Sequence, residues 1–182
     1  MPLVEITPDQ DIVIALAYAT AENITGKPIY RQARCFLHAD AAAAVARAAA
    51  LARPLGLRLQ ILDAFRPTEA QFLLWDACPD PSFLADPRRG SPHSRGVAVD
   101  LTLLDESGAP LDMGTPFDAF TPLSHHASTA VTVAAQRNRF LLLGLMSAAG
   151  WDFYGKEWWH YQLFDVGRYP LLGDRDAPAP IM

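Results

Sequence analysis

The chain has 182 residues, of which 51% are hydrophobic and 19% charged, and its formal net charge is −5. This length and composition predict one globular domain, residues 1–182, with a flexible tail at 174–182. The negative net charge argues against a nucleic-acid partner, which normally leaves a basic footprint. No apolar stretch reaches the roughly 18 residues that a membrane span needs, so no membrane partner is expected either.

Two cysteines, Cys35 and Cys78, are present, and neither has a CxxC partner. A zinc site built from cysteines is therefore excluded, whereas the pairing of these two thiols stays open. The apolar run at residues 12–21 follows acidic residues instead of the basic ones that open a signal peptide. We therefore expect a cytoplasmic protein.

The first third of the chain alternates strand and helix patterns. Alternating apolar side chains predict strands at residues 12–18 and 57–61. Between them, Asp40 is expected to cap an alanine-rich helix that ends at Pro54.

A second helix and a long loop are expected next. Thr68 and Gln71 have the spacing of a capping box, which predicts a helix from 68 to about residue 76. The prolines and the glycine in residues 78–92 then predict a surface loop. Loops of this length in compact domains are often functional.

The second half of the chain predicts a strand at 97–104, a long apolar helix at 129–149 and a last strand at 158–164. Strands and helices alternate irregularly, and the late elements have hairpin-like spacings. We therefore predict an α+β fold with a mainly antiparallel central sheet flanked by helices.

The segment SPHSRGVAVD at residues 91–100 combines two zinc-ligand side chains. His93 lies in the loop that enters the strand, and Asp100 lies within the strand. Asp100 needs an explanation, because a carboxylate in a Val/Leu-rich strand must be paired or bound to metal. Gly96 allows the close approach that would bring both side chains to one ion. Catalytic zinc sites use three such ligands and leave one position open.

The segment EWWHY at residues 157–161 offers a third ligand, His160, and a spare acid, Glu157. On a regular strand these two side chains would point to opposite faces, because three residues is an odd step. Both can face one metal only if Glu157 lies in the turn after Gly155 or at a bulge. Glu157 would then move a proton from the attacking water to the leaving amine.

Each segment alone has an ordinary explanation, either as a solvated loop histidine or as a tryptophan-rich core strand. Together they supply two histidines and two acids, which favours a metal site. The rival pair is His125 and His126, but adjacent side chains diverge on any regular element. His38 has no carboxylate or histidine in useful register. We expect none of these three to be a ligand.

Arg66 also stands out, because it follows a predicted strand and precedes Pro67. It either serves catalysis or forms a salt bridge with Asp63 or Glu69, and the sequence alone leaves both open.

The pattern SxHxxGxAxD at 91–100, followed by ExWH at 157–160, resembles the zinc D-alanyl-D-alanine peptidases. It resembles in particular their dipeptidase branch, which includes the vancomycin-resistance dipeptidase. Further segments similar to that branch are residues 18–26, 63–71, 112–118 and 158–161. Ile24 stands where that branch is expected to have Phe.

The resemblance implies the fold of the D-Ala-D-Ala metallopeptidases and Hedgehog-like domains, with the zinc site at the sheet. One zinc ion per chain would be held by His93, Asp100 and His160. A zinc-bound water would attack the peptide bond, with Glu157 as acid/base and Arg66 stabilising the anionic intermediate.

The resemblance also implies a substrate, the small dipeptide D-alanyl-D-alanine, which would be hydrolysed to two D-alanines. Ser91, Asp118 and Tyr18 would contact it, with Ser91 and Asp118 near its ammonium group. For Asp118, a turn or N-cap role before Thr121 is the alternative. The alternative functions are a peptidoglycan D,D-carboxypeptidase or endopeptidase, or a non-catalytic zinc-binding module.

Overall fold

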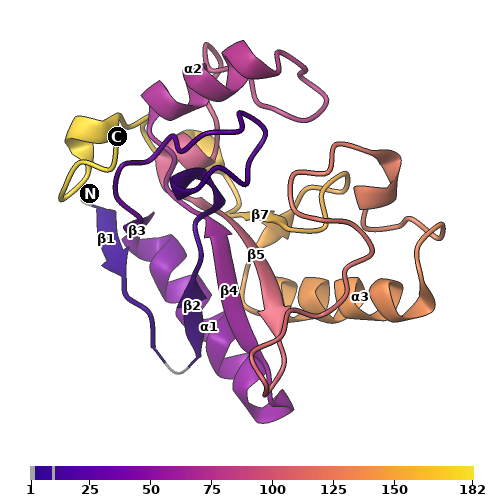
Figure 1. The fold of residues 1–182 in the computed structure, drawn as a ribbon. Helices are drawn as coiled ribbons and strands as arrows, with labels where there is room; N and C mark the ends of the chain where they lie inside the picture. Colours follow the sequence, from indigo (N-terminus) through magenta and orange to yellow (C-terminus); the bar gives the residue numbers. More distant parts are fainter. Residues whose placement is uncertain (1–2, 10) are drawn as a thin grey trace.

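A computed structural model describes residues 3–9 and 11–182 and has a five-stranded sheet at its centre (Figure 1). The spatial order of the strands is β2 (Ile12–Ile14), β4 (Arg58–Asp63), β5 (Ala98–Leu104), β7 (His160–Gln162) and β6 (Asp152–Phe153). β2 pairs with β4 in parallel, and the other three pairings are antiparallel.

The α+β class is confirmed, but the sheet is mixed, because its edge strand β2 is parallel to β4. Parallel neighbours need a crossover connection. Here it contains β3 (Cys35–His38) and α1 (Ala39–Ala52). β3 pairs with β1 (Leu3–Ile6) in a small antiparallel sheet, which the sequence analysis did not predict.

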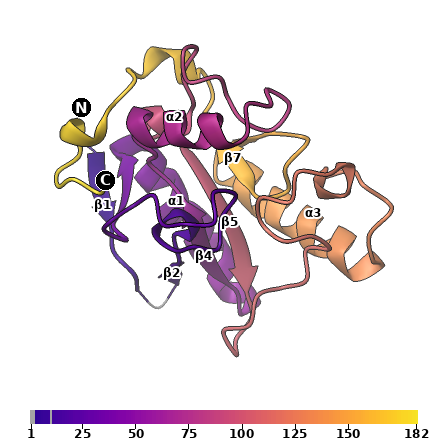
Figure 2. The same cartoon turned by 45° about the horizontal axis from the view of Figure 1, so that its top comes forward.

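In the part of the chain that the structure describes, three α-helices flank the central sheet. Helix α2 (Thr68–Ala77) lies across the carboxyl end of β4, and α3 (Val133–Ala148) packs against α1 and β6 (Figures 1 and 2). α1 lies behind the sheet and buries one stripe of small side chains, Ala41, Ala44, Val45, Ala48, Ala49 and Ala52. Small side chains let this helix approach the strands closely.

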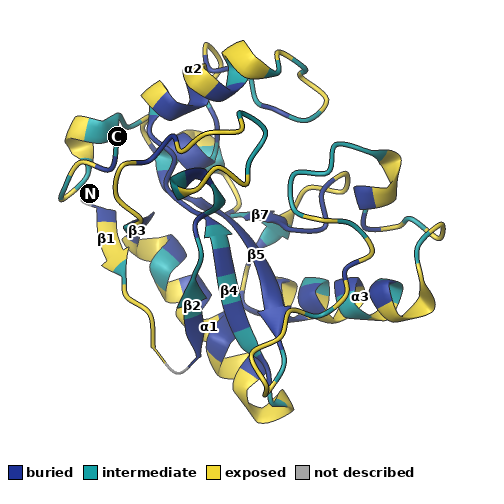
Figure 3. Ribbon diagram, in the orientation of Figure 1, coloured by how far each residue is buried: buried dark blue, intermediate teal, exposed yellow. Residues whose placement is uncertain are grey.

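The hydrophobic core lies between the sheet and α1, and Figure 3 shows β5 as buried along its whole length. In β4 the buried side chains alternate with half-buried ones, as predicted, and Leu59 and Ile61 face the core. The face of the sheet that α1 covers is therefore apolar. Polar side chains that could take part in chemistry lie on the other face and at the carboxyl end of β4.

Two predicted helix caps are wrong. The Nδ1 atom of His38, not Asp40, accepts the backbone N–H at the start of α1, with Asp40 as the donor at 3.2 Å. At α2 the N-cap residue is Pro67, which has no side-chain acceptor. Thr68 and Gln71 make tertiary hydrogen bonds instead, so local spacing was outweighed by more distant partners.

Three predicted elements are longer than the real ones. The strand predicted at 12–18 ends at Ile14, and Ala17–Ala19 form a 3₁₀ turn that directs Tyr18 inward. The helix predicted from 129 begins at Val133, because the Thr132 side chain accepts the N–H of Ala135. The strand predicted at 158–164 is limited to β7, since tight turns precede it.

Cys35 and Cys78 are both free thiols. In the tail, Ile181 is buried and its carbonyl accepts the backbone N–H of Arg31 at 2.7 Å. The flexibility of residues 174–182 and the cytoplasmic location stay predictions. Across residues 3–9 and 11–182, no helix combines the length and the apolarity that crossing a membrane requires.

Candidate active site

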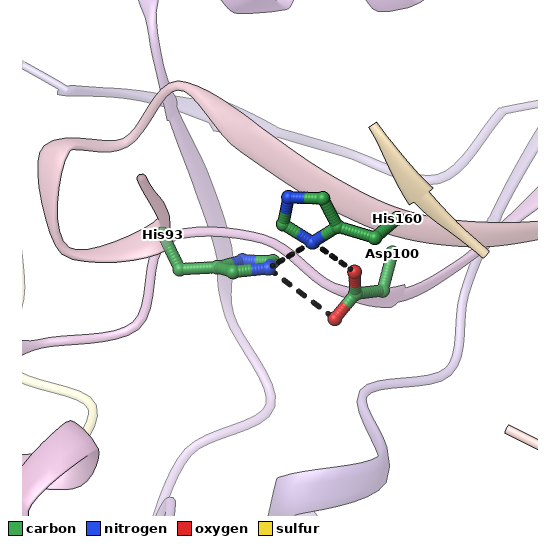
Figure 4. A group of neighbouring side chains, drawn as sticks. All are labelled: His93, Asp100 and His160. Carbon is green, nitrogen blue, oxygen red and sulfur yellow. Dashed lines mark hydrogen bonds and ion pairs between the residues drawn. The ribbon is translucent and has the colours of Figure 1, made fainter. Parts of the chain in front are cut away.

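His93, Asp100 and His160 come together in one buried cluster (Figure 4). The Nε2 atom of His93 lies 3.2 Å from Nδ1 of His160 and 3.3 Å from Oδ2 of Asp100. The Nδ1 atom of His160 lies 3.0 Å from Oδ1 of Asp100. Two imidazole nitrogens and two carboxylate oxygens therefore converge on one point.

Strand pairing explains most of this convergence. Asp100 of β5 and His160 of β7 are direct cross-strand partners, so their side chains stand next to each other on one face of the sheet. His93 begins a 3₁₀ turn that leads into β5. Gly96 closes that turn at a φ of 67°, and an added Cβ would lie 3.1 Å from the backbone nitrogen of His38. Only glycine fits there without a shift.

The outer nitrogen of each imidazole faces a hydrogen-bond acceptor. Nδ1 of His93 donates to the carbonyl of Ala64 at 2.7 Å, and Nε2 of His160 donates to Oε1 of Gln162 at 3.1 Å. These bonds fix the tautomers, so the inner nitrogens carry lone pairs. Lone pairs that face each other and a carboxylate repel unless a cation lies between them. The donor set therefore fits a metal ion.

Glu157 lies in the turn before β7, where its N–H bonds to the carbonyl of Tyr154. Glu157 and His160 consequently line the same cavity, as the irregularity proposed from the sequence requires. Burial, together with the nearby charges of Asp100 and Asp118, raises the pKa of Glu157 to about 8. A carboxyl group poised near neutral pH can both accept and release a proton.

Arg66 makes the predicted ion pair with Asp63, and it lines the cavity as well. Both side chains are buried, and the Nε and NH2 atoms of Arg66 lie 2.8 and 2.7 Å from Oδ2 of Asp63. Its guanidinium carbon also lies 4.9 Å from the centre of the Tyr18 ring. The two interpretations of Arg66 are therefore compatible, because Asp63 fixes a cation at the cavity wall.

The cavity has a volume of about 240 Å³, and all eight site residues expected from the sequence line it. The loop at residues 78–92 forms one wall. Phe83 of this loop stacks on Phe120 with ring centres 4.7 Å apart, and the hydroxyl of Tyr154 donates to the carbonyl of Ser82 at 3.3 Å. Side chains from distant parts of the chain thus hold this loop in place at the cavity wall.

Three further predicted residues, Tyr18, Ser91 and Asp118, contribute polar groups to the cavity lining. The hydroxyl of Tyr18 donates to Oδ2 of Asp118 at 2.9 Å, and Oγ of Ser91 accepts the N–H of His93 at 3.2 Å. Asp118 has a φ of 58°, and burial together with the charge of Asp100 raises its pKa to about 7. The side chain of Thr121 caps the next 3₁₀ turn, so Asp118 is not that cap, but Asp118 does lie in a turn, as the alternative interpretation also expected.

Known proteins with similar sequences share one description. The family described as D-ala-D-ala dipeptidase matches residues 1–175. A D-alanyl-D-alanine dipeptidase of Escherichia coli (strain K12) is 52% identical over 165 residues, which cover 91% of this chain and 86% of that protein. The Enterococcus faecium protein of the same name is 34% identical, and the alignment covers 81% of this chain and 84% of that protein. The Streptomyces coelicolor protein is 36% identical, with 80% and 83% covered.

The chain belongs to the D-Ala-D-Ala dipeptidase family. The resemblance read from the two motifs is thereby confirmed, and the chain is a dipeptidase of the hydrolase class. A metallopeptidase family implies a metal cofactor, and the cluster of His93, Asp100 and His160 is a site that could hold it.

The other histidines lie outside this cluster. The side chain of His38 caps α1, and the backbone carbonyl of His125 accepts a hydrogen bond from Arg139. His126 is buried with its ring edge-on to Phe153, and burial lowers its pKa to about 4. Within residues 3–9 and 11–182, none of the three joins a group of metal-ligand side chains.

Sequence reasoning missed two side chains that support this dipeptidase site. Gln162 receives the hydrogen bond of His160, and strand alternation could have found it, because residues two apart share a face. Gln71 bonds to Arg66, whereas its spacing from Thr68 is typical of a helix cap. No local pattern distinguishes these two roles.

Proposed function

We propose that this chain hydrolyses D-alanyl-D-alanine to two D-alanines. The observation that carries the proposal is one cavity of about 240 Å³ that holds the metal-ligand cluster, a buried acid and a buried guanidinium. This volume is below the roughly 300–1,000 Å³ typical of drug-sized ligands, which favours a very small substrate. The names of the relatives support the same choice of dipeptide.

The proposed metal is one zinc ion per chain, bound by His93, Asp100 and His160. Zinc accepts nitrogen and oxygen ligands at 2.0–2.2 Å, so its tetrahedral ligands lie roughly 3.3–3.6 Å apart. The nitrogen–nitrogen and nitrogen–oxygen spacings of 3.0–3.3 Å in the cluster support this assignment. When bound, zinc would polarise the scissile carbonyl and lower the pKa of a coordinated water to about 7.

Glu157 is the proposed general acid/base. Its carboxylate would take a proton from the attacking water and pass it to the leaving amine. Support comes from its position on the cavity wall with the metal-ligand cluster and from its raised pKa of about 8.

Arg66 is proposed to stabilise the negative charge on the tetrahedral intermediate. A buried guanidinium held by Asp63 is oriented before the reaction starts, so little reorganisation is needed when the oxyanion forms. An effect on turnover, with little effect on substrate binding, would distinguish this role from that of a clamp for the substrate carboxylate.

The free ammonium of the dipeptide is proposed to bind at Asp118, with Tyr18 and Ser91 beside it. A partly buried carboxylate attracts a charged amine and stays unpaired when an acylated substrate arrives. The enclosing contacts of loop 78–92 also argue for a closed dipeptide pocket and against the open groove that a peptidoglycan carboxypeptidase or endopeptidase needs.

Zinc-loaded protein should be assayed with D-Ala-D-Ala, L-Ala-L-Ala and D-Ala-D-Ala-D-Ala. We expect fast hydrolysis of the D,D-dipeptide alone. The matched control is Glu157→Gln, which keeps the size of the side chain and the three metal ligands. Faster cleavage of the tripeptide would favour a carboxypeptidase, and one bound zinc with no hydrolysis of any substrate would favour a non-catalytic module.

A further inference from the structure

Gln71 links the guanidinium of Arg66 to the loop that walls the cavity. It belongs to α2 and its side chain is buried. Helix α2 lies above the carboxyl end of β4 (Figure 1). Its Oε1 atom accepts from NH1 of Arg66 at 2.9 Å, and its Nε2 atom donates to the carbonyl of Ala85 at 2.8 Å. One amide therefore bridges two parts of the site.

The side-chain amide of Gln71 satisfies both partners. The guanidinium of Arg66 offers donors alone, whereas the carbonyl of Ala85 is only an acceptor. A side chain between them must accept on one side and donate on the other. An ionised glutamate would accept from Arg66 but repel the carbonyl, and methionine would fill the same space with neither bond.

The two linked groups both line the cavity. Ala85 belongs to loop 78–92, which has no helix or strand of its own, so its position depends on side-chain contacts. The Phe83–Phe120 stack and the Tyr154–Ser82 hydrogen bond hold its outer part. Gln71 holds its inner part, next to Arg66.

We propose that Gln71 is a positioning residue, which couples the closed position of loop 78–92 to the orientation of Arg66. The kinetic part of this inference rests on the proposed dipeptidase function. When the loop is closed, Ala85 fixes the amide, and the amide then fixes the guanidinium in addition to Asp63. Gln71 itself acts through Arg66 and has no part in the chemical step.

The kinetic test uses Gln71→Met and Gln71→Glu with D-Ala-D-Ala as substrate. We expect Gln71→Met to lower kcat about ten-fold, the ratio that one lost charge-assisted hydrogen bond corresponds to, with a smaller change in KM. Gln71→Glu keeps an acceptor for Arg66 but loses the bond to Ala85, so its kcat should fall between those of the wild type and Gln71→Met. In an Arg66→Ala background, Gln71→Met should lower kcat less than two-fold, because its partner is already absent.

A second readout needs no activity. Arg88 and Arg89 are exposed in loop 78–92. Trypsin would cut the peptide bonds that follow them when the loop opens. Brief trypsin digestion followed by mass spectrometry should show several-fold faster cleavage there in both Gln71 variants. The matched control is Thr68→Val, which removes a hydrogen bond of 2.8 Å from the same helix to the carbonyl of Leu172. It should change neither kcat nor cleavage at Arg88 and Arg89.

The proposal is overturned if Gln71→Met lowers kcat equally with and without Arg66, if Gln71→Glu is as slow as Gln71→Met, or if cleavage at Arg88 and Arg89 is unchanged. A wild-type protein that hydrolyses no dipeptide would instead refute the proposed function. The digestion would still test the link between Gln71 and the loop.

Discussion

Replacing Asp118 by Asn is expected to stabilise the protein and at the same time to harm the site. Burial, with the nearby charge of Asp100, raises the pKa of this carboxyl from 3.8 to about 7, so its charged form is unfavourable in the folded protein. Asn has the same shape, can still accept the hydrogen bond of Tyr18, and tolerates the left-handed φ of 58°. The substitution therefore removes the charge and little else.

The expected gain in the stability of Asp118→Asn follows from the pKa values of Asp118 in the unfolded and folded states. In the unfolded chain Asp118 loses its proton near pH 3.8, whereas in the folded protein it does so near pH 7. Wild-type stability consequently falls as pH rises through this window and stays low above it. A rise in pKa from 3.8 to about 7 corresponds to about 4 kcal/mol of stability. The advantage of Asp118→Asn should be near zero at pH 4 and approach this value by pH 7.5.

Urea unfolding of the metal-free protein at pH 4.5, 6 and 7.5 measures this advantage as a shift in midpoint at constant slope. In the zinc-loaded enzyme the same variant should lose about 10–100-fold of its preference for D-Ala-D-Ala over the N-acetyl dipeptide. A variant less stable than the wild type at pH 7.5, or one with the same gain at pH 4.5, would show that the carboxylate is well paired in the folded protein.

Glu157→Gln should keep about one zinc per chain and lose at least 100-fold in turnover, as metal analysis and steady-state kinetics would reveal; near wild-type turnover would make Glu157 a structural acid. Gln162→Ala should weaken zinc binding about 10–100-fold in a chelator competition, because His160 loses the acceptor that fixes its tautomer; unchanged affinity would rule out this support. Neither ring nitrogen of His126 has a hydrogen-bond partner among residues 3–9 and 11–182, so His126→Leu should preserve stability at pH 7. In the unfolded chain His126 takes up a proton near pH 6.5, whereas in the folded protein it does so only near pH 4. As the pH falls from 6.5 to 4, the wild type should therefore lose about 3 kcal/mol of stability that His126→Leu does not lose. Equal acid sensitivity of both proteins in urea unfolding would contradict this.

The metal-ligand cluster could be predicted from the sequence because its members leave local signals. Asp100 is a carboxylate in an otherwise apolar strand, and the alternation of that strand fixes its face. His160 lies within the predicted strand 158–164, and its pairing with Asp100 across β5 and β7 is what the structure adds. Glu157 required a break in strand geometry, and the turn before β7 provides it.

Several supporting contacts could not be predicted, because they join residues far apart in the chain. The spacing of Thr68 and Gln71 fits a capping box, yet these side chains donate to the carbonyls of Leu172 and Ala85. Tyr18 continues an alternating apolar pattern, but the chain turns after β2 and brings its hydroxyl to Asp118. Local propensity is a weak guide where a buried polar group finds a stronger partner elsewhere.

The most direct test of the account compares hydrolysis of D-alanyl-D-alanine and N-acetyl-D-alanyl-D-alanine by the zinc-loaded wild-type protein. The proposed site is closed by loop 78–92, and Asp118 binds the ammonium group of the substrate. Its kcat/KM should therefore be at least ten-fold higher for the free dipeptide than for the acetylated one. Equal rates would contradict the dipeptidase assignment and favour a carboxypeptidase.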